Sequence, residues 1–278
     1  MIKPSQSLCL GIVGLLLLFS SSTSAQTYRV LLTNDDGIES PLLAALKVEL
    51  QALPGVEVMV SAPHENQSGS SQSSAGGDFM VDEIYRDGTL FGYAVHGRPA
   101  DAVRFGLVML SDGNDFDLVV SGINRGANVG DVSHLSGTVG AAMQAQFQGI
   151  PSIAISQDVG DVDTVASAKF AARLVQRYQR EGAPRGVVLS INIPGGELRG
   201  VRVRPMGDSY LGTAGYELLG QSGNSSTYRR ERIIVQSTDS TTDTYSYQNG
   251  FITITPLKFD WTDHDFLSEV ESWNLQLN

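Results

Sequence analysis

A short apolar run that ends in two adjacent aspartates constrains this chain most. Residues 30–32 (Val-Leu-Leu) are typical of a parallel strand that is covered on both faces. The turn Asn-Asp-Asp-Gly follows at 34–37, and Ser40 and Pro41 are favourable residues for the start of a helix. Adjacent carboxylates in a strand point to opposite faces, but in a turn at the strand's carboxyl end both can face one ligand. The stretch therefore predicts a strand–turn–helix unit of an open α/β sheet.

The rest of the chain predicts the same fold class. Strand and helix patterns alternate up to residue 194, with strands at 28–33, 56–62, 117–121, 152–156 and 186–193, helices at 41–53, 99–110, 136–148 and 163–180, and a hairpin at 79–85 and 90–95. We interpret residues 26–194 as one core, with a mostly parallel sheet flanked by helices. From 195 the pattern changes to β segments at 201–205, 233–237 and 251–256, with a loop at 237–244. Residues 195–278 are predicted to be a β-rich C-terminal extension for oligomer contacts or for shaping the rim of the site.

The first 25 residues predict where the protein is located. The apolar run from Leu10 to Phe19 is too short to span a membrane, which takes about 20 residues, and small residues around Ala25 suit a cleavage site. We interpret residues 1–25 as a secretory signal peptide and expect a periplasmic or secreted protein with no membrane contact after cleavage; a membrane anchor is the alternative. Cys9 is the only cysteine, so the remaining chain has neither disulfides nor thiolate metal ligands.

The net charge of the chain limits the kinds of molecule that it can bind. Without Lys3 the chain has 18 basic and 30 acidic residues, a net charge of 18 − 30 = −12. Such an acidic chain is not suited to a broad grip on a phosphate backbone, so no stable nucleic-acid partner is expected. If the protein binds phosphate, a metal and backbone amides must supply the positive field locally.

Polar residues follow three of the predicted strands. Asp35 and Asp36 follow the first, Asn66 and Ser68 the second, and Asn124 and Asn128 the third. An oxygen shell of Asp35, Asp36, Ser68 and Asn124 suits one divalent cation, Mg²⁺ or Mn²⁺. The alternative is that these residue types only form turns.

A second motif lies just downstream. Ser136, Gly137 and Thr138 open a predicted helix whose free amides can hold a phosphate, although Ser136 also reads as an ordinary N-cap. A metal ion beside such amides is the arrangement that metal-assisted phosphoester hydrolysis requires. No nucleotide-binding glycine motif stands at a strand–helix junction, and the four scattered histidines form no close pair in the sequence, which argues against zinc.

Four motifs together resemble those of the SurE survival-protein family. They are Leu-Leu-Thr-Asn-Asp-Asp-Gly (31–37), Ala-Pro-His-Glu-Asn-Gln-Ser-Gly (62–69), Val-Ser-Gly-Ile-Asn-Arg-Gly-Ala-Asn-Val-Gly (120–130) and Ser-Gly-Thr-Val-Gly-Ala-Ala (136–142). The resemblance implies a metal-dependent 5′/3′-nucleotidase that acts on nucleoside monophosphates and related phosphoesters. It implies metal ligation by Asp35, Asp36, Ser68 and Asn124. It also implies a Rossmann-like catalytic core at 26–194, with a C-terminal extension used in the assembly of a homodimer or homotetramer.

We take Asp35 and Asp36 as the catalytic residues; whether an aspartate or a water starts the attack stays open. The predicted substrate and phosphate contacts are Asn66, Asn128, Ser136, Gly137 and Thr138. Leu135 stands where many relatives carry an aromatic residue, which bears on substrate preference.

Three other functions fit parts of the sequence. An exported acid phosphatase of broad specificity would use the same residues. A non-catalytic nucleotide- or phosphate-binding protein would need the loops but not a complete metal shell. A serine hydrolase would use Ser68 or Ser136, but neither lies in a Gly-x-Ser-x-Gly motif.

Overall fold

The computed structural model describes residues 27–277, so the predicted signal peptide (1–25) lies outside the described residues. The strands are β1 (Tyr28–Thr33), β2 (Val56–Pro63), β3 (Val81–Arg86), β4 (Thr89–Val95), β5 (Leu118–Arg125), β6 (Ser152–Gln157), β7 (Val187–Ile193), β8 (Val201–Val203), β9 (Leu211–Ser222), β10 (Ser225–Ile234) and β11 (Ile252–Lys258). The helices are α1 (Pro41–Gln51), α2 (Pro99–Met109), α3 (Gly137–Phe147), α4 (Thr164–Glu181), α5 (Asp243–Gln248) and α6 (Leu267–Ser272), with a 3₁₀ helix, η1, at Gly130–His134.

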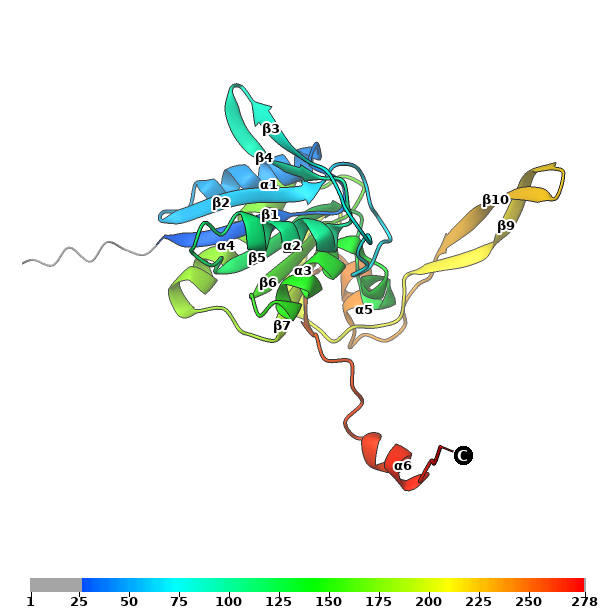
Figure 1. Cartoon of the computed structure of the whole chain (residues 1–278). Coiled ribbons are helices and arrows are strands. Elements are labelled where there is room, and N and C mark those ends of the chain that lie inside the picture. The colour runs from blue at the N-terminus through cyan, green and yellow to red at the C-terminus, as the bar shows by residue number, and fades with distance from the viewer. Residues whose placement is uncertain (1–26, 278) are drawn as a thin grey trace, which may run out of the picture.

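One large sheet organises the fold (Figure 1). Among the described residues its order is β3-β4-β2-β1-β5-β6-β7-β11-β8. The strands from β4 to β7 in this order are parallel, whereas β3 runs antiparallel to β4 and β11 antiparallel to β7. The predicted Rossmann-like, mostly parallel fold is confirmed.

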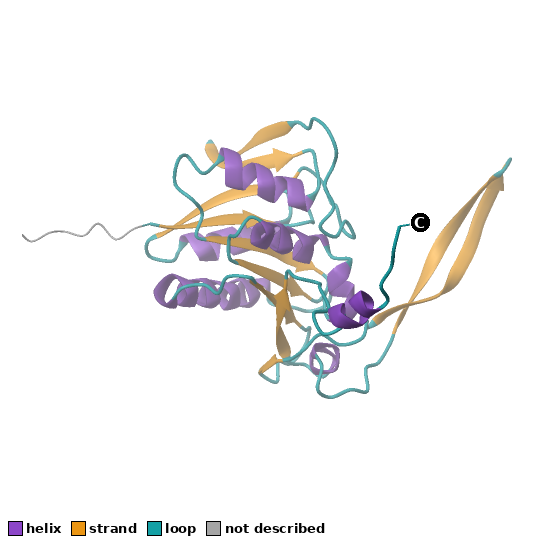
Figure 2. Cartoon of the chain, turned by 60° about the horizontal axis from the view of Figure 1, so that its bottom comes forward, coloured by secondary structure: helices purple, strands orange, loops and turns teal. Residues whose placement is uncertain are grey.

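Helices cover both faces of this sheet, as Figure 2 shows. Helices α1 and α4 pack together over one face, and α2 and α3 over the other. Strand β1 follows this division: Val30 and Leu32 lie in the core cluster beneath α1 and α4, and Leu31 lies in the cluster beneath α2 and α3. All three side chains are fully buried, as the apolar run predicts.

The chain order places a switch point beside β1. After β1 the chain forms β2, β3 and β4 on one side of β1, and it then returns to β5 on the other side. Such a reversal opens a crevice at the carboxyl ends of the two central strands, where ligands bind in open α/β sheets. Asp35 follows β1, and Asn124 lies near the end of β5.

Strand β5 is longer than predicted: the sequence pattern suggested a loop from Gly122 onward, but the strand continues to Arg125. Gly122 has φ +141°, and the pairing of β5 with β6 shifts between Ser121 and Asn124. A Cβ atom at Gly122 would lie 2.4 Å from the carbonyl oxygen of Ile155, so only glycine fits this close approach. The irregularity lets the strand continue and carry Asn124 to its end.

The C-terminal part departs furthest from the predicted elements. Strands β8 and β11 join the main sheet, while β9 and β10 form a separate antiparallel hairpin that projects from the core (Figure 1). The hairpin was missed apart from its last residues, and the predicted loop at 237–244 ends in α5, which Thr242 caps with its side chain. The use of this extension in oligomer contacts stays a prediction. No helix within residues 27–277 is both long and apolar enough to cross a membrane.

Candidate phosphate and metal site

The turn after β1 is held by Asn34. Its Nδ2 donates to the carbonyl oxygen of Gly37 (2.9 Å), and its Oδ1 accepts from the amide of Gly37 (3.2 Å). Gly37 has φ +99°, a conformation that glycine adopts without strain. Asn34 therefore shapes the turn and leaves the two aspartates to face the carboxyl edge of the sheet.

Asp35 is buried against the start of α3. The hydroxyl of Thr138 donates to its Oδ1 (2.5 Å), and the amide of Gln67 donates to its carbonyl oxygen (2.7 Å). A Cβ atom on Gly137 would lie 2.9 Å from Oδ2, so glycine is needed there for the helix to approach. Burial, with a smaller contribution from the charge of Asp36, raises the pKa of Asp35 from 3.8 to about 6, although the hydrogen bond from Thr138 opposes this rise.

Asp36 binds two other segments. Its Oδ1 accepts from Asn66 Nδ2 (3.1 Å) and its Oδ2 from the backbone amide of Arg125 (2.9 Å). Burial raises the pKa of Asp36, and these hydrogen bonds oppose the rise. The carboxylate thus joins the loop after β2 to the end of β5.

The other two predicted metal ligands are placed by similar contacts. The Ser68 amide donates to Asn66 Oδ1 (3.0 Å), so Asn66 positions both Asp36 and Ser68. Asn124 donates through Nδ2 to the carbonyl oxygen of Gly126 (2.7 Å), which turns its Oδ1 away from that carbonyl. The side-chain nitrogen and oxygen of Asn66 each make one of these hydrogen bonds. The substrate contact predicted for Asn66 stays a prediction.

The predicted phosphate contacts divide into two groups. Ser136 caps α3 by accepting from the amide of Val139 (3.1 Å), as predicted, which leaves the amides of Gly137 and Thr138 without partners inside the helix. Asn128 instead donates its Nδ2 to Ser156 (2.8 Å) and its amide to Asn192 Oδ1 (2.6 Å). Its buried side chain therefore holds the loop after β5 in place.

A cavity of about 510 Å³ brings these residues together. Asp35, Ser68, Asn124, Asn128 and Ser136 line it, so the structure unites residues from four separate segments. This volume lies in the ordinary range for small-ligand sites.

The cavity also has walls that the sequence did not predict. Tyr210, Arg230 and Arg232, from the base of the projecting hairpin, line it, as does Arg125. Tyr210 donates its hydroxyl to the carbonyl oxygen of Ala127 (3.1 Å), which fixes the base of the hairpin on the β5 loop. The arginine-rich run 229–232 was the one available signal, but nothing in the sequence placed it beside Asp35.

The donor set fits a hard divalent cation. Asp35, Ser68 and Asn124 bring a carboxylate, a hydroxyl and an amide group to one cavity, and Asp36 lies close enough to perturb Asp35. Oxygen ligands of this kind are those that Mg²⁺ and Mn²⁺ prefer. Two carboxyl groups whose pKa values are raised by burial also gain from a cation beside them.

The fold and the site thus define a Rossmann-like protein with a cavity at its switch point whose oxygen donors suit a hard divalent cation. The family model described as survival protein SurE matches residues 30–213. The 5′-nucleotidase SurE of Chlorobaculum tepidum is 35% identical over 260 residues, covering 92% of this chain and 98% of that protein. The 5′-nucleotidase SurE of Rhodopirellula baltica is 37% identical over 258 residues, covering 89% and 99%.

A solved structure agrees. The crystal structure of the SurE protein from Aquifex aeolicus superposes with a TM-score of 0.76 at 30% identity, covering 89% of this chain and all of that one. The chain belongs to the survival protein SurE family, which confirms the resemblance of its four motifs.

Proposed function

We propose that this protein is a divalent-metal-dependent phosphomonoesterase that hydrolyses nucleoside 5′- and 3′-monophosphates to nucleoside and phosphate. One observation carries the proposal: Asp35, Ser68 and Asn124 share a cavity with the N-terminus of α3. Relatives that match almost the whole chain are named 5′-nucleotidases, which supports the same activity.

The chain's own residues divide the work. Asp35, Asp36, Ser68 and Asn124 would hold the cation, which would supply positive charge at the phosphoryl group and lower the pKa of a water molecule. The amides of Gly137 and Thr138, with the helix dipole behind them, donate hydrogen bonds to the phosphate oxygens. Because Gly137 and Thr138 are buried, their amides act in a medium of low dielectric, where they stabilise developing charge most strongly.

The hairpin base supplies the substrate end of the site. Arg230 and Arg232 add positive charge to a cavity in an otherwise acidic protein, which favours an anionic substrate. Tyr210 offers an aromatic wall at the same cavity, although its hydroxyl is committed to Ala127. A phosphate linked to an apolar, planar base matches these two features.

Steady-state hydrolysis tests the proposal. Purified protein is incubated with Mn²⁺, with Mg²⁺ or with EDTA, and phosphate release is measured from 5′-AMP, 3′-AMP and p-nitrophenyl phosphate. The proposal predicts metal-dependent release, with the nucleotides ahead of p-nitrophenyl phosphate. Equal rates on all three would indicate a broad phosphatase, and nucleotide binding without phosphate release would indicate a binding protein.

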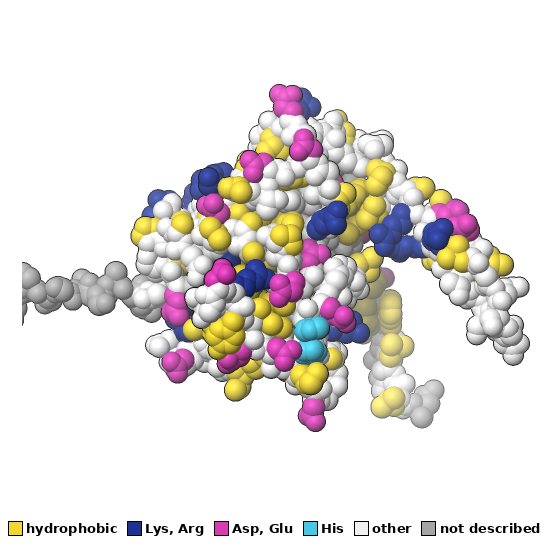
Figure 3. Space-filling model, turned by 90° about the horizontal axis from the view of Figure 1, so that it is seen from above, with side chains coloured by type: hydrophobic (Ala, Val, Ile, Leu, Met, Phe, Trp, Pro, Cys, Tyr) yellow, Lys and Arg dark blue, Asp and Glu magenta, His cyan; other side chains and the backbone are white. Residues whose placement is uncertain are grey.

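The hairpin also supports a homo-oligomer. A two-stranded hairpin has little stability alone in water, yet β9 and β10 expose Tyr216, Leu218, Tyr228 and Ile234. Figure 3 shows apolar and basic side chains gathered where the hairpin leaves the core. We infer that a second copy of this chain packs on these side chains.

A further inference from the structure

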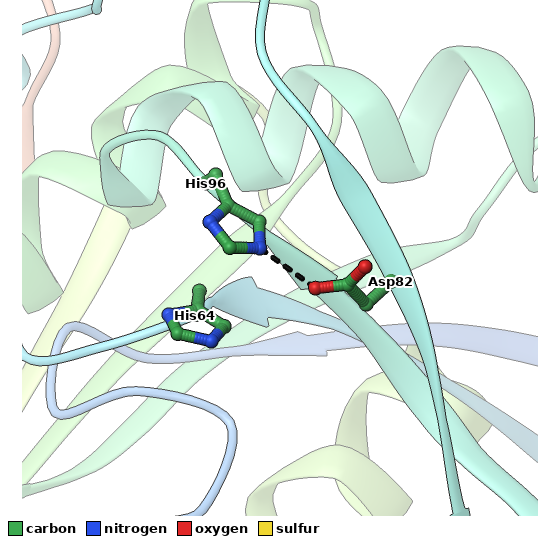
Figure 4. Close-up of side chains that lie close together, drawn as sticks. All are labelled: His64, Asp82 and His96. Carbon is green, nitrogen blue, oxygen red and sulfur yellow. Dashed lines mark hydrogen bonds and ion pairs between the residues drawn. The ribbon is translucent and has the colours of Figure 1, made fainter.

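Three strand ends meet at a cluster of ligand-type side chains outside the proposed active site. His64 follows β2, Asp82 lies in β3 and His96 follows β4 (Figure 4). One potential ligand atom from each lies within 4.8 Å of those of the other two, and within residues 27–277 no other three His, Cys, Asp or Glu side chains meet that geometry. His96 Nε2 lies 2.7 Å from Asp82 Oδ2, and the ring of His64 stacks on that of His96 with centroids 4.1 Å apart.

Backbone pairing holds the three residues in register. Strands β2 and β4 are parallel, with Pro63 opposite Val95, and the amide of His64 donates to the carbonyl oxygen of Val95 (2.8 Å). Strand β3 pairs with β4 with Asp82 opposite Ala94, and the amide of His96 donates to the carbonyl oxygen of Met80 (2.9 Å).

Side chains two residues apart in a strand share a face, so this register places Asp82 diagonally across from His96. The main chain therefore brings the cluster together, and chance overlap of flexible side chains does not explain it.

The ligand types differ from those of the active site. Two imidazoles and one carboxylate, with a fourth position left for water, are the ligands of many open Zn²⁺ sites, whereas Mg²⁺ and Mn²⁺ take oxygen ligands. A cavity of about 350 Å³ beside His64 and His96 gives water access. Glu65 also lines this cavity, and so does Arg98, whose charge opposes a cation.

We propose that His64, Asp82 and His96 form a second metal site, which binds Zn²⁺ and is separate from the oxygen-lined site. The sequence argued against zinc because no two histidines are close in the chain, and the strand register removes that objection. Ligand atoms around a tetrahedral Zn²⁺ lie roughly 3.3 Å apart, so side-chain rotations close the cluster without movement of the strands.

The ordinary alternative is a surface ion pair between His96 and Asp82, with His64 only stacked beside it. The side chains of His96 and Asp82 are 26% and 55% exposed, and such pairs contribute little to stability. His64 contributes nothing to an ion pair between His96 and Asp82, whereas a metal site needs ligands from all three residues. This difference makes the proposal testable.

The position of His64 gives the site a consequence. His64 begins the segment that carries Asn66 and Ser68, so Zn²⁺ would tie the start of this segment to the β3–β4 hairpin. Hydrogen exchange of residues 64–70 should slow on Zn²⁺ binding even without a nucleotide or phosphate.

Calorimetric titration with Zn²⁺ tests the proposal on the untagged full chain, in buffer that contains saturating Mg²⁺ to fill the oxygen-lined site. We expect one Zn²⁺ per chain. Loss of a residue that merely supports a metal ligand costs up to about 100-fold in affinity, so His64→Ala, Asp82→Asn and His96→Ala should each lose at least about that much.

The controls separate this site from the others. His264→Ala removes the other exposed histidine that is paired with a carboxylate, that of Asp260, and should bind Zn²⁺ as the wild type does. Asp36→Asn, which impairs the proposed catalytic site, should also bind Zn²⁺ normally, so the two proposals fail independently. Circular dichroism melting of each variant shows whether it is folded.

Two outcomes would overturn the proposal. One is the absence of stoichiometric Zn²⁺ binding to the wild type. The other is that folded His64→Ala binds Zn²⁺ as the wild type does, whether or not Asp82→Asn and His96→Ala lose binding. Visible absorption of bound Co²⁺, a spectroscopic substitute for Zn²⁺, gives an independent readout: it should change in each variant and stay unchanged in His264→Ala.

Discussion

The hydroxyl of Thr138, on the first turn of α3, donates a 2.5 Å hydrogen bond to Oδ1 of Asp35, at the end of β1. Both side chains are buried, with exposed fractions of 0% and 2%. The contact therefore couples the proposed phosphate-binding end of the helix to a proposed metal ligand. It also favours the ionised form of Asp35, which burial disfavours.

Thr138→Val tests this coupling, because valine keeps the shape of threonine but cannot donate. We expect the pKa of Asp35 to rise further above about 6, since the bond from Thr138 lowers it. Mn²⁺ affinity at pH 7 should fall, and the acid limb of the kcat/KM profile should move to higher pH. Thr138→Ser, which restores a donor, should recover the wild-type profile. An unchanged acid limb in Thr138→Val would show that the contact has no electrostatic role.

The raised pKa of Asp35 also predicts a pH-dependent stability of the metal-free protein. Between pH 3.8 and about 6 the unfolded chain releases the Asp35 proton and the folded chain retains it, so this group lowers the free energy of unfolding as pH rises. Asp35→Asn should therefore gain stability relative to the wild type across this window, by roughly 2–3 kcal/mol in total. Urea unfolding with EDTA at pH 4, 5, 6 and 7 measures the difference. A difference that does not change with pH would contradict the assigned pKa.

Gly137→Ala tests the close approach of α3 to Asp35. An added Cβ would lie 2.8 Å from Asp35 Cβ and 2.7 Å from Ser70 Oγ, so something must move. We expect a loss of about 1–3 kcal/mol of stability and weaker Mn²⁺ binding, although alanine is the better helix former. Thermal unfolding and Mn²⁺ titration measure both effects. Gly160→Ala is the control, because a Cβ there has open space; equal behaviour of the two variants would refute the steric argument.

The proposed oligomer depends on the projecting hairpin. Leu218 and Tyr228 are cross-strand partners, and their exposed fractions are 49% and 57%. Replacing both with Asp should convert a dimer or tetramer to a monomer, since charges are costly to bury in an interface. Light scattering after size exclusion measures the mass. Val108→Asp, an equally exposed apolar position on α2, should leave the oligomer intact. A wild type that is monomeric at high concentration would contradict the inference.

We also propose export with cleavage between Ala25 and Gln26. Expression of the chain with its own N-terminus should yield a periplasmic or secreted protein whose intact mass corresponds to a start at Gln26. Replacing Leu15 and Leu16 with Arg should block export, because it interrupts the apolar run. Recovery of only full-length chain from the cytoplasm would refute this address.

Much of the core could be predicted, since buried parallel strands and amphipathic helices leave clear apolar patterns. The β9–β10 hairpin could not, because most of its side chains on both faces are exposed and no alternation marks it. The site was predictable to the level of strand ends: Asp35, Ser68 and Asn124 do share a cavity. The position of Arg232 at this cavity and the stacking of His64 on His96 depend on strand register and tertiary placement, which no local pattern records.

The central claim is that Asp36 and its neighbours hold a catalytic metal. Asp36→Asn removes an anionic ligand with little change in volume, although it also weakens the hydrogen bonds from Asn66 and Arg125. Asp87→Asn is the matched control, because Asp87 lies in the exposed β3–β4 turn with φ +50°, a conformation that asparagine tolerates.

The most direct measurement is the rate of 5′-AMP hydrolysis across a Mn²⁺ titration, with melting temperatures taken with and without Mn²⁺. In Asp36→Asn we predict a fall in turnover of about 10²-fold or more at ordinary Mn²⁺ concentrations, and a smaller stabilisation by Mn²⁺. The metal-free melting temperature should hold or rise, since one of two neighbouring charges is removed. Wild-type activity in Asp36→Asn at every Mn²⁺ concentration would contradict the metal site and the function proposed from it.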